Sequence, residues 1–279
     1  KTYMGIVRSA FLVGPDGAGK TSLFRMLTTL LLPDSGSATV DGNDIVRDYT
    51  TIRKKVGYMP GRFSLYQDLT VEENLHFFAT IFNTSISENY DLVKDIYSQI
   101  EPFKKRMAGK LSGGMKQKLA LSCALIHRPV VLFLDEPTTG VDAVSRKEFW
   151  EMLQRLREQQ ITIIVSTPYM DEAMRCDRIG LMQSGKFLST GTPQEVIGKF
   201  TDTLLAVKAD NMHRLLQKLK TFEGIKDAYP FGEYHHAVLH NGISIGDLQQ
   251  FLDPIEYTGL QVQPVAPDIE DCFMQLMKG

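Results

Sequence analysis

Short apolar runs alternate with amphipathic segments along the first part of the chain. Residues 10–13, 56–59, 130–134 and 161–167 are almost uninterrupted apolar runs, each bounded by glycine, proline or polar residues. Runs of this kind, without polar alternation, are typical of parallel strands covered on both faces. The segments between them have helical spacing, so the pattern predicts an α/β fold built on a parallel sheet.

The same pattern predicts the elements around this sheet. A β-hairpin is expected at Asp41-Gly42, a helical insertion over about residues 68–126, and a further helix that begins at Ser145. An antiparallel meander is expected around the Ser184-Gly185 turn. The helix after residue 19 is expected to bury one face, made of Leu23, Leu27, Leu30 and Leu31.

Beyond residue 203 the elements become short strands and helices of mixed order, typical of a small α+β module. A chain of 279 residues also exceeds what one hydrophobic core usually supports. We therefore expect a main domain over residues 1–200 and an accessory domain over residues 203–279.

The stretch from Ala10 to Leu27 combines an apolar run, a glycine-rich loop and a helix. Glycines let several backbone N–H groups point at one anion, and the helix dipole adds positive potential there. In such a phosphate loop Lys20 reaches the β- and γ-phosphates, and the Thr21 hydroxyl binds Mg²⁺. The predicted nucleotide-binding residues are Gly14, Pro15, Asp16, Gly17, Ala18, Gly19, Lys20, Thr21 and Ser22.

Asp135 and Glu136 directly follow the apolar run 130–134. Ligands of open α/β sheets gather at the carboxyl ends of the strands, where a phosphate-loop protein needs a carboxylate for its metal ion. Asp135 is the predicted second Mg²⁺ ligand. Glu136 is placed to orient or deprotonate a water that attacks the γ-phosphate, so Glu136 and Lys20 are the predicted catalytic residues.

Three motifs in this order, GPDGAGKT, LSGGMKQ and VVLFLDEP, resemble the nucleotide-binding subunit of ATP-binding-cassette (ABC) transporters. The resemblance covers residues 1 to about 200, and it implies a P-loop ATPase core with an antiparallel β subdomain and a helical subdomain. It also implies ATP and Mg²⁺ as cofactors.

In this family two cassettes associate head to tail, and each ATP lies between the phosphate loop of one and the LSGG helix of the other. The hydroxyl of Ser112 and the N–H groups after it at a helix start can form that second anion site. The family also places Asp142 in the loop across the dimer contact, and Tyr3 on the adenine ring. The implied signature residues are Leu111, Ser112, Gly113, Gly114, Met115, Lys116 and Gln117.

The tail segment PDIEDCF (267–273) resembles the closing helix of exporter cassettes of the daunorubicin-resistance type. This implies an exporter whose membrane-spanning permease is a separate subunit, with the chain at the cytoplasmic face of the cell membrane. Its second cassette is either another copy or a different chain. Phe63, Leu65 and Tyr66 are candidates for the apolar contact with the permease.

Two positions depart from the family pattern. Gly61 stands where the family has a glutamine that contacts Mg²⁺ and the lytic water, and Pro168 replaces a histidine that contacts the γ-phosphate. Neither side chain can donate a hydrogen bond or carry a proton. One hypothesis is a slow ATP site whose signature segment completes the site of another cassette. The other is normal hydrolysis, with Gln67 or a permease residue replacing the glutamine.

Composition and residue spacing argue against some functions, among them nucleic-acid binding and metal binding. A formal charge of −2 and a pI near 6.3 give no basic footprint for nucleic acid. The odd number of cysteines indicates free thiols in a reducing cytosol, and the spacing of His235, His236 and His240 does not favour a metal site. Two alternatives stay open: a soluble cassette ATPase outside transport, and an ATP-binding module with little hydrolysis.

Overall fold

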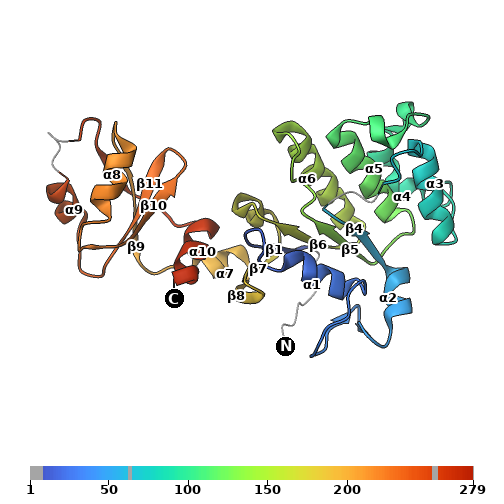
Figure 1. Ribbon diagram of the computed structural model, residues 1–279, viewed down its shortest axis with the longest axis horizontal. Helices are drawn as coiled ribbons and strands as arrows, with labels where there is room; N and C mark the ends of the chain where they lie inside the picture. The colour runs from blue at the N-terminus through green and yellow to red at the C-terminus, as the bar shows by residue number, and fades with distance from the viewer. Residues whose placement is uncertain (1–8, 62–64, 253–256, 279) are drawn as a thin grey trace. The chain divides into compact units, whose positions relative to one another are not determined.

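The structure is a computed structural model that describes residues 9–61, 65–252 and 257–278. It divides into two compact units, Lys1–Pro193 and Gln194–Gly279, each drawn in Figure 1. The boundary lies slightly before the one expected at residues 200–203. In the described ranges no helix has both the length and the apolar character that crossing a membrane requires.

The first unit is built on one mixed sheet, as the apolar runs predict. Its strand order is β4-β5-β6-β1-β7-β8, parallel from β4 to β7, with β8 antiparallel at the edge. The strands are β1 (Ser9–Val13), β4 (Val56–Met59), β5 (Val131–Asp135), β6 (Thr162–Thr167), β7 (Arg178–Gln183) and β8 (Lys186–Gly191).

The register of this sheet brings its functional loops to one edge. Asp135 pairs with Ser166, and Val13 pairs with Thr167, in neighbouring parallel strands. Because these residues end β5, β6 and β1, the loops that follow the three strands start side by side. The phosphate loop, the carboxylate pair and the segment at Pro168 are therefore neighbours.

Two helices cover opposite faces of the sheet (Figure 1). Helix α1 (Lys20–Leu27) packs Phe24 into a cluster with Leu12 of β1. Helix α6 (Ala143–Glu158) packs Trp150 against Phe11, with ring centroids 5.2 Å apart. Successive strand residues point to opposite faces of a sheet, so Leu12 faces α1 and Phe11 faces α6.

The expected hairpin is present as β2 (Thr39–Val40) and β3 (Asn43–Asp44). Asp41 and Gly42 both have positive φ, 48° and 75°, as a two-residue turn of this type requires. Helix α2 (Tyr49–Lys55) follows and leads into β4.

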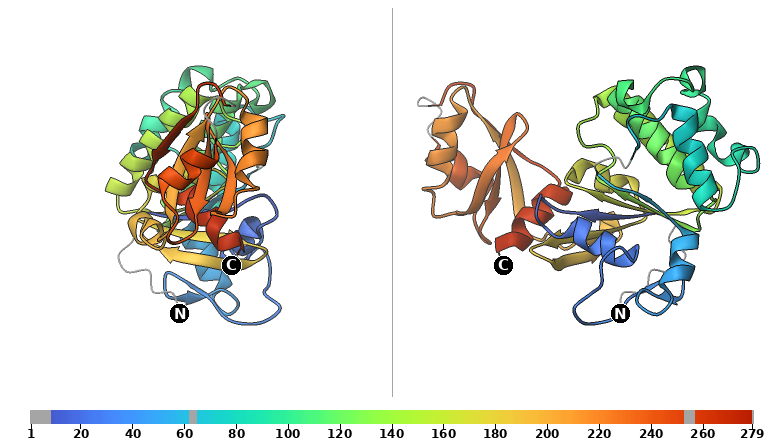
Figure 2. Two further views of the ribbon diagram at one scale, coloured as in Figure 1. Left: turned by 90° about the vertical axis from the view of Figure 1, so that its left-hand side faces the viewer. Right: turned by 45° about the vertical axis from the view of Figure 1, so that its right-hand side comes forward.

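The expected helical insertion is also present, and Figure 2 shows its helices gathered together within the first unit. A capping box between Thr70 and Glu73 starts the first helix. The elements are α3 (Val71–Ile81), α4 (Tyr90–Tyr97), the short 3₁₀ helices η1 (Glu101–Phe103) and η2 (Ala108–Lys110), and α5 (Gly113–Leu125).

Two helix boundaries were predicted wrongly. Helix α1 ends at Leu27, because the Thr28 hydroxyl bonds the Phe24 carbonyl and Thr29 turns to a φ of 63°. Leu30 and Leu31 therefore lie outside the helix, and both are exposed. Helix α6 begins at Ala143 rather than Ser145, because the Asp142 carboxylate accepts the Val144 and Ser145 N–H groups.

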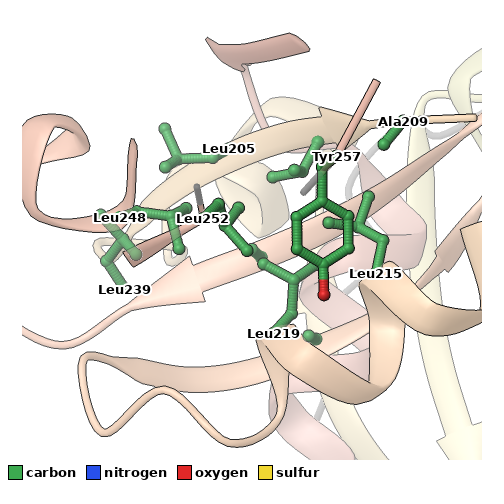
Figure 3. Packing of buried hydrophobic residues seen from close by; sticks show 11 residues of the cluster. Leu205, Ala209, Leu215, Leu219, Leu239, Leu248, Leu252 and Tyr257 are labelled. Atoms are coloured by element: carbon green, nitrogen blue, oxygen red, sulfur yellow. The ribbon is translucent and has the colours of Figure 1, made fainter. Parts of the chain in front are cut away.

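The second unit is an antiparallel sheet of order β10-β11-β9-β12 with helices packed on it. Its apolar core joins side chains of β9, α8 and α9, among them Leu205, Leu215 and Leu248 (Figure 3). The elements are α7 (Pro193–Ile197), β9 (Thr203–Lys208), α8 (Met212–Leu219), β10 (Ile225–Phe231), β11 (Tyr234–Leu239), α9 (Ile245–Phe251), β12 (Gln261–Pro264) and α10 (Ile269–Lys278).

Two of the histidines noted in the sequence are buried in β11. His235 Nε2 lies 2.7 Å from the Met212 carbonyl oxygen, and His236 Nδ1 lies 2.6 Å from Asp271 Oδ1. Each ring therefore has its own structural partner.

Candidate functional site

The loop between β1 and α1 owes its shape to its glycines. Gly17 and Gly19 have φ of 77° and 100°, in the left-handed region that side chains disfavour. A Cβ at Gly14 would lie 2.1 Å from the Met182 carbonyl oxygen, so this position accepts only glycine. The loop thus turns tightly into the N-terminus of α1, where free N–H groups favour an anion.

Lys20 lies in the first turn of α1, with only 3% of its surface exposed. Its Nζ donates to the carbonyls of Gly14 at 2.8 Å and Pro15 at 3.0 Å, and it lies 3.1 Å from Glu136 Oε1. The structure therefore brings the two predicted catalytic residues into contact at the phosphate loop.

Asp135 ends β5 and is 2% exposed. Its Oδ1 accepts a hydrogen bond of 2.5 Å from Ser166, and its Oδ2 lies 3.4 Å from the Tyr58 hydroxyl. Burial, together with the nearby Asp135 charge, raises the pKa of Tyr58 to about 12, so this hydroxyl keeps its proton. Thr21, the other predicted metal ligand, is half-buried in the first turn of α1. A carboxylate and a hydroxyl are oxygen donors that suit Mg²⁺.

Glu136 has a φ of 49°, an uncommon backbone conformation for a residue with a side chain. Its N–H donates to the Ser166 carbonyl and hydroxyl oxygens at 3.0 and 3.1 Å. Its side chain is 24% exposed, in contrast to that of Asp135. The turn at the end of β5 therefore buries one carboxylate and leaves the next accessible to a water.

The signature residues differ in how much of each is exposed to solvent. Ser112 is the N-cap of α5, where its Oγ accepts the Met115 N–H at 3.3 Å. Ser112 and Gly113 are exposed, Gly114 to Lys116 are partly exposed, and Leu111 and Gln117 are buried. Gln117 donates from Nε2 to the Pro137 carbonyl at 2.6 Å. The N-terminus of α5 is thus accessible, while Gln117 joins this helix to the loop after Glu136.

Asp142, expected in a dimer contact, is exposed at the N-terminus of α6. The N–H of Ser145 is the main cause of the lowered pKa of its carboxyl group. The capping role is thus observed, and the dimer contact stays a prediction.

The two unusual positions adjoin the carboxylate pair. A Cβ at Gly61 would lie 3.0 Å from the Asp135 carbonyl oxygen and 3.8 Å from the Glu136 Cβ. Pro168 is half-buried and directly follows Thr167, the last residue of β6. A side chain at Gly61 would therefore enter the site beside Asp135 and Glu136.

Tyr3 and Phe63 lie outside the described residues. Leu65 is buried, and Tyr66 is 49% exposed with its ring edge-to-face against Phe77 at 4.6 Å. The Gln67 carbonyl accepts the Gly109 N–H at 2.9 Å, which ties this residue to the helical subdomain.

Sequence reasoning missed several residues that shape the site. Ser166 binds both Asp135 and Glu136, Tyr58 lies beside Asp135, and Glu172 is buried next to the loops that follow β5 and β6. The only signal for Ser166 was a polar residue at the end of an otherwise apolar strand.

A glycine loop with a buried lysine, next to an acidic pair at the end of a parallel strand, defines a P-loop nucleotide-binding protein. Residues 7–139 match the family model described as ABC transporter. Relatives that resemble the chain are likewise described as ATP-binding proteins of transporters.

One relative is the Escherichia coli K12 protein described as "Probable multidrug ABC transporter ATP-binding protein YbhF". It is 38% identical over 272 residues, which are 96% of this chain and 46% of that protein. Nod factor export ATP-binding protein I of Burkholderia lata is 39% identical over 189 residues, 67% of this chain and 62% of that protein. The chain thus spans about half the length of the Escherichia coli relative.

Among solved structures, cbiO1 from Clostridium perfringens, described as part of the ABC transporter complex cbiONQ, has 27% sequence identity. The TM-score is 0.60, over 69% of this chain and 80% of that one. This likeness supports the α/β P-loop fold of the ABC ATPase type.

Proposed function

We propose that the chain is the ATP-binding and ATP-hydrolysing subunit of an exporter of the daunorubicin-resistance type. It acts at the cytoplasmic face of the membrane and drives a separate permease. The observation that carries the proposal is the contact between Lys20 and Glu136 at the phosphate loop, next to buried Asp135.

In this proposal separate groups of the chain bind the phosphates, hold the metal ion and accept a proton. The amides of the phosphate loop and Lys20 bind the phosphates, so the triphosphate competes with Glu136 for the lysine cation. Thr21 and Asp135 supply oxygen ligands for Mg²⁺, which when bound neutralises charge on the β- and γ-phosphates. Glu136, freed from Lys20, accepts a proton from the attacking water.

A second cassette completes the site. The exposed N-terminus of α5 at Ser112 and Gly113 offers N–H groups and a hydroxyl to an anion. In a head-to-tail dimer this segment covers the γ-phosphate held by the other cassette, and Tyr3 stacks on adenine. ATP then favours the closed dimer and hydrolysis releases it, which biases the permease between two states.

Gly61 and Pro168 favour a slow site within this proposal. The loss of one preorganised contact to the transition state typically lowers the rate about 10²- to 10³-fold. ATP binding persists, because the phosphate loop, Lys20 and Asp135 do not depend on these positions. The alternative function, an ATP-binding module with little hydrolysis, rests on the same two residues.

The permease has a candidate docking groove in the first unit. It has a volume of about 630 Å³ and lies between β4 and the helical subdomain. Among the candidates named from the sequence, Leu65 lines this groove, and its apolar wall also includes Tyr58, Met59, Phe78, Phe82 and Ala120. The names of the two relatives, one for multidrug transport and one for Nod factor export, support an exporter.

The deciding experiment measures ATP binding and phosphate release by the purified chain with Mg²⁺. Binding with slow release is expected, and the absence of any adenine-nucleotide binding would refute the proposal. Pull-down from detergent-solubilised membranes of its own cells should recover a hydrophobic membrane protein. Recovery from the soluble fraction alone would favour a cassette ATPase outside transport.

A further inference from the structure

Glu172 is a buried acidic residue that the proposed chemistry does not use. It lies in the short 3₁₀ helix η3 (Met170–Arg175), just after Pro168, and is 1% exposed. Burying a carboxylate is costly unless its oxygens are hydrogen-bonded. The partners of Glu172 therefore indicate why the carboxylate is there.

Three donors from separate elements meet on this carboxylate. The Thr138 hydroxyl donates to Oε1 at 2.9 Å, and Trp150 Nε1 donates to the same oxygen at 3.1 Å. The Thr167 hydroxyl donates to Oε2 at 2.6 Å. The Arg146 guanidinium of α6 lies 3.9 Å from Oε1. We call Glu172, Thr138, Thr167 and Trp150 the Glu172 cluster.

The loops that follow β1, β5 and β6 each have a connection to this cluster. Thr138 belongs to the loop that begins with Glu136. The Thr167 carbonyl accepts the N–H of Gly14, the first residue of the phosphate loop, at 3.3 Å, while its hydroxyl binds Glu172. Ser166, the preceding residue, binds Asp135 and Glu136. Thr138 and Thr167 therefore connect these loops to the Glu172 carboxylate.

The cluster also reaches α6, whose N-terminus holds Asp142. Trp150 packs on Phe11 and Phe149 and donates to Glu172, so its indole joins the site loops to the body of this helix. Figure 1 shows β5, β6 and α6 together in the first unit.

We propose that Glu172 is a positioning residue of the ATP site, which holds the loops after β5 and β6 in register and links their state to α6. Glu172 acts through Thr138 and Thr167 and does not itself touch ATP. This inference rests on the proposed function, because it assumes that nucleotide binds at the phosphate loop.

The test uses the single tryptophan of the chain, Trp150, which is itself a member of the cluster. The experiment uses the whole 279-residue chain. ATP binding is measured by equilibrium dialysis, Trp150 emission is recorded with and without Mg-ATP, and turnover is measured by phosphate release. The variants are Thr138→Val and Thr167→Val, which keep the side-chain shape but remove the hydroxyl. Thr138→Ser and Thr167→Ser keep the hydroxyl.

The matched control is Thr28→Val, which removes a buried hydroxyl bonded at 2.8 Å to the Phe24 carbonyl, outside the cluster. We expect the valine variants to bind ATP within about two-fold of wild type but to lose the ATP-induced emission change. Their kcat should fall about ten-fold or more, because each variant loses a hydroxyl bond to the charged Glu172 carboxylate. The serine variants and Thr28→Val should behave like wild type.

The outcomes separate the two proposals. If wild-type protein binds no ATP, the proposed function fails. If it binds ATP but the valine variants keep both the wild-type emission change and the wild-type kcat, Glu172 has no positioning role. The emission change alone decides the matter if wild-type turnover is too slow to measure.

Discussion

The side-chain amide of Gln117 donates a hydrogen bond of 2.6 Å to the carbonyl oxygen of Pro137. Gln117 lies in α5, whose N-terminus would serve the ATP of another cassette, and Pro137 directly follows Glu136. One buried bond thus connects the helix that would contact the ATP of the other cassette with the loop that follows the proposed general base. Lys118 and Glu148 form a further contact between α5 and α6, at 2.9 Å.

Gln117→Leu should destabilise the first unit by about 1 kcal/mol, because it leaves the Pro137 carbonyl without its donor. Removal of the buried Gln117 Oε1, which has no hydrogen-bond partner among the described residues, offsets part of this cost. Denaturant unfolding followed by Trp150 emission measures this change. Gln99→Leu is the control, since Gln99 is an exposed residue that bonds the Asp95 carbonyl at 3.1 Å. Equal stability of the two variants would show that the Pro137 bond contributes little.

Glu136→Gln should abolish phosphate release while ATP binding is retained. A positioned general base typically contributes about 10²- to 10⁴-fold to the rate, and the glutamine amide cannot accept the proton. The change also removes the charge that pairs with Lys20, so binding of the triphosphate should not weaken. Glu158→Gln, a change at an exposed carboxylate of α6, controls for loss of a surface charge. Unchanged turnover in Glu136→Gln would exclude Glu136 as the base.

Gly61→Gln should raise turnover if the missing glutamine makes the site slow. The added Cβ meets the Asp135 carbonyl oxygen at 3.0 Å, so the backbone must yield by a few tenths of an ångström. Gly61→Ala introduces the same Cβ without the amide and therefore measures the steric cost alone. A ratio of the two kcat values of about 10² or more is expected, because one transition-state contact typically contributes about 10²- to 10³-fold.

Gln67→Ala tests the competing hypothesis in the same assay. Gln67 is held by the helical subdomain through the Gly109 N–H, so the replacement should leave turnover unchanged. A large fall in kcat would instead support Gln67 as the substitute for the missing glutamine. It would also predict little gain from Gly61→Gln.

The sequence was most informative where one local pattern decides the structure. The apolar runs gave the strands, and the glycines before Lys20 gave the phosphate loop, because close backbone approach and positive φ depend on the residues themselves. The end of α1 was missed since the Thr28 hydroxyl and the turn at Thr29 overrode the leucine spacing. Glu172 and Gln117 could not be found, because their partners lie far along the chain and only the folded sheet brings them together.

The pH dependence of stability gives an independent test of how deeply Glu172 is buried. Burial raises the pKa of Glu172 above 4.5, although Thr167, Thr138 and Trp150 oppose this by bonding the charged form. The native state then binds the proton more tightly than the unfolded state does. The stabilisation is complete below the unfolded pKa and is lost as pH rises through the native one.

Glu172→Gln removes this titration. As pH increases from about 4 to 7, the free energy of unfolding of wild type should therefore fall relative to that of the variant. Chemical denaturation at several pH values measures this difference, and Glu158→Gln provides the comparison with a carboxylate exposed on α6. At neutral pH the variant should still be less stable than wild type. Its side-chain NH₂ group replaces one carboxylate oxygen and cannot accept a hydrogen bond from a hydroxyl of Thr138 or Thr167. A difference that is constant with pH would mean that Glu172 has the same proton affinity folded and unfolded, so the three donors fully offset its burial.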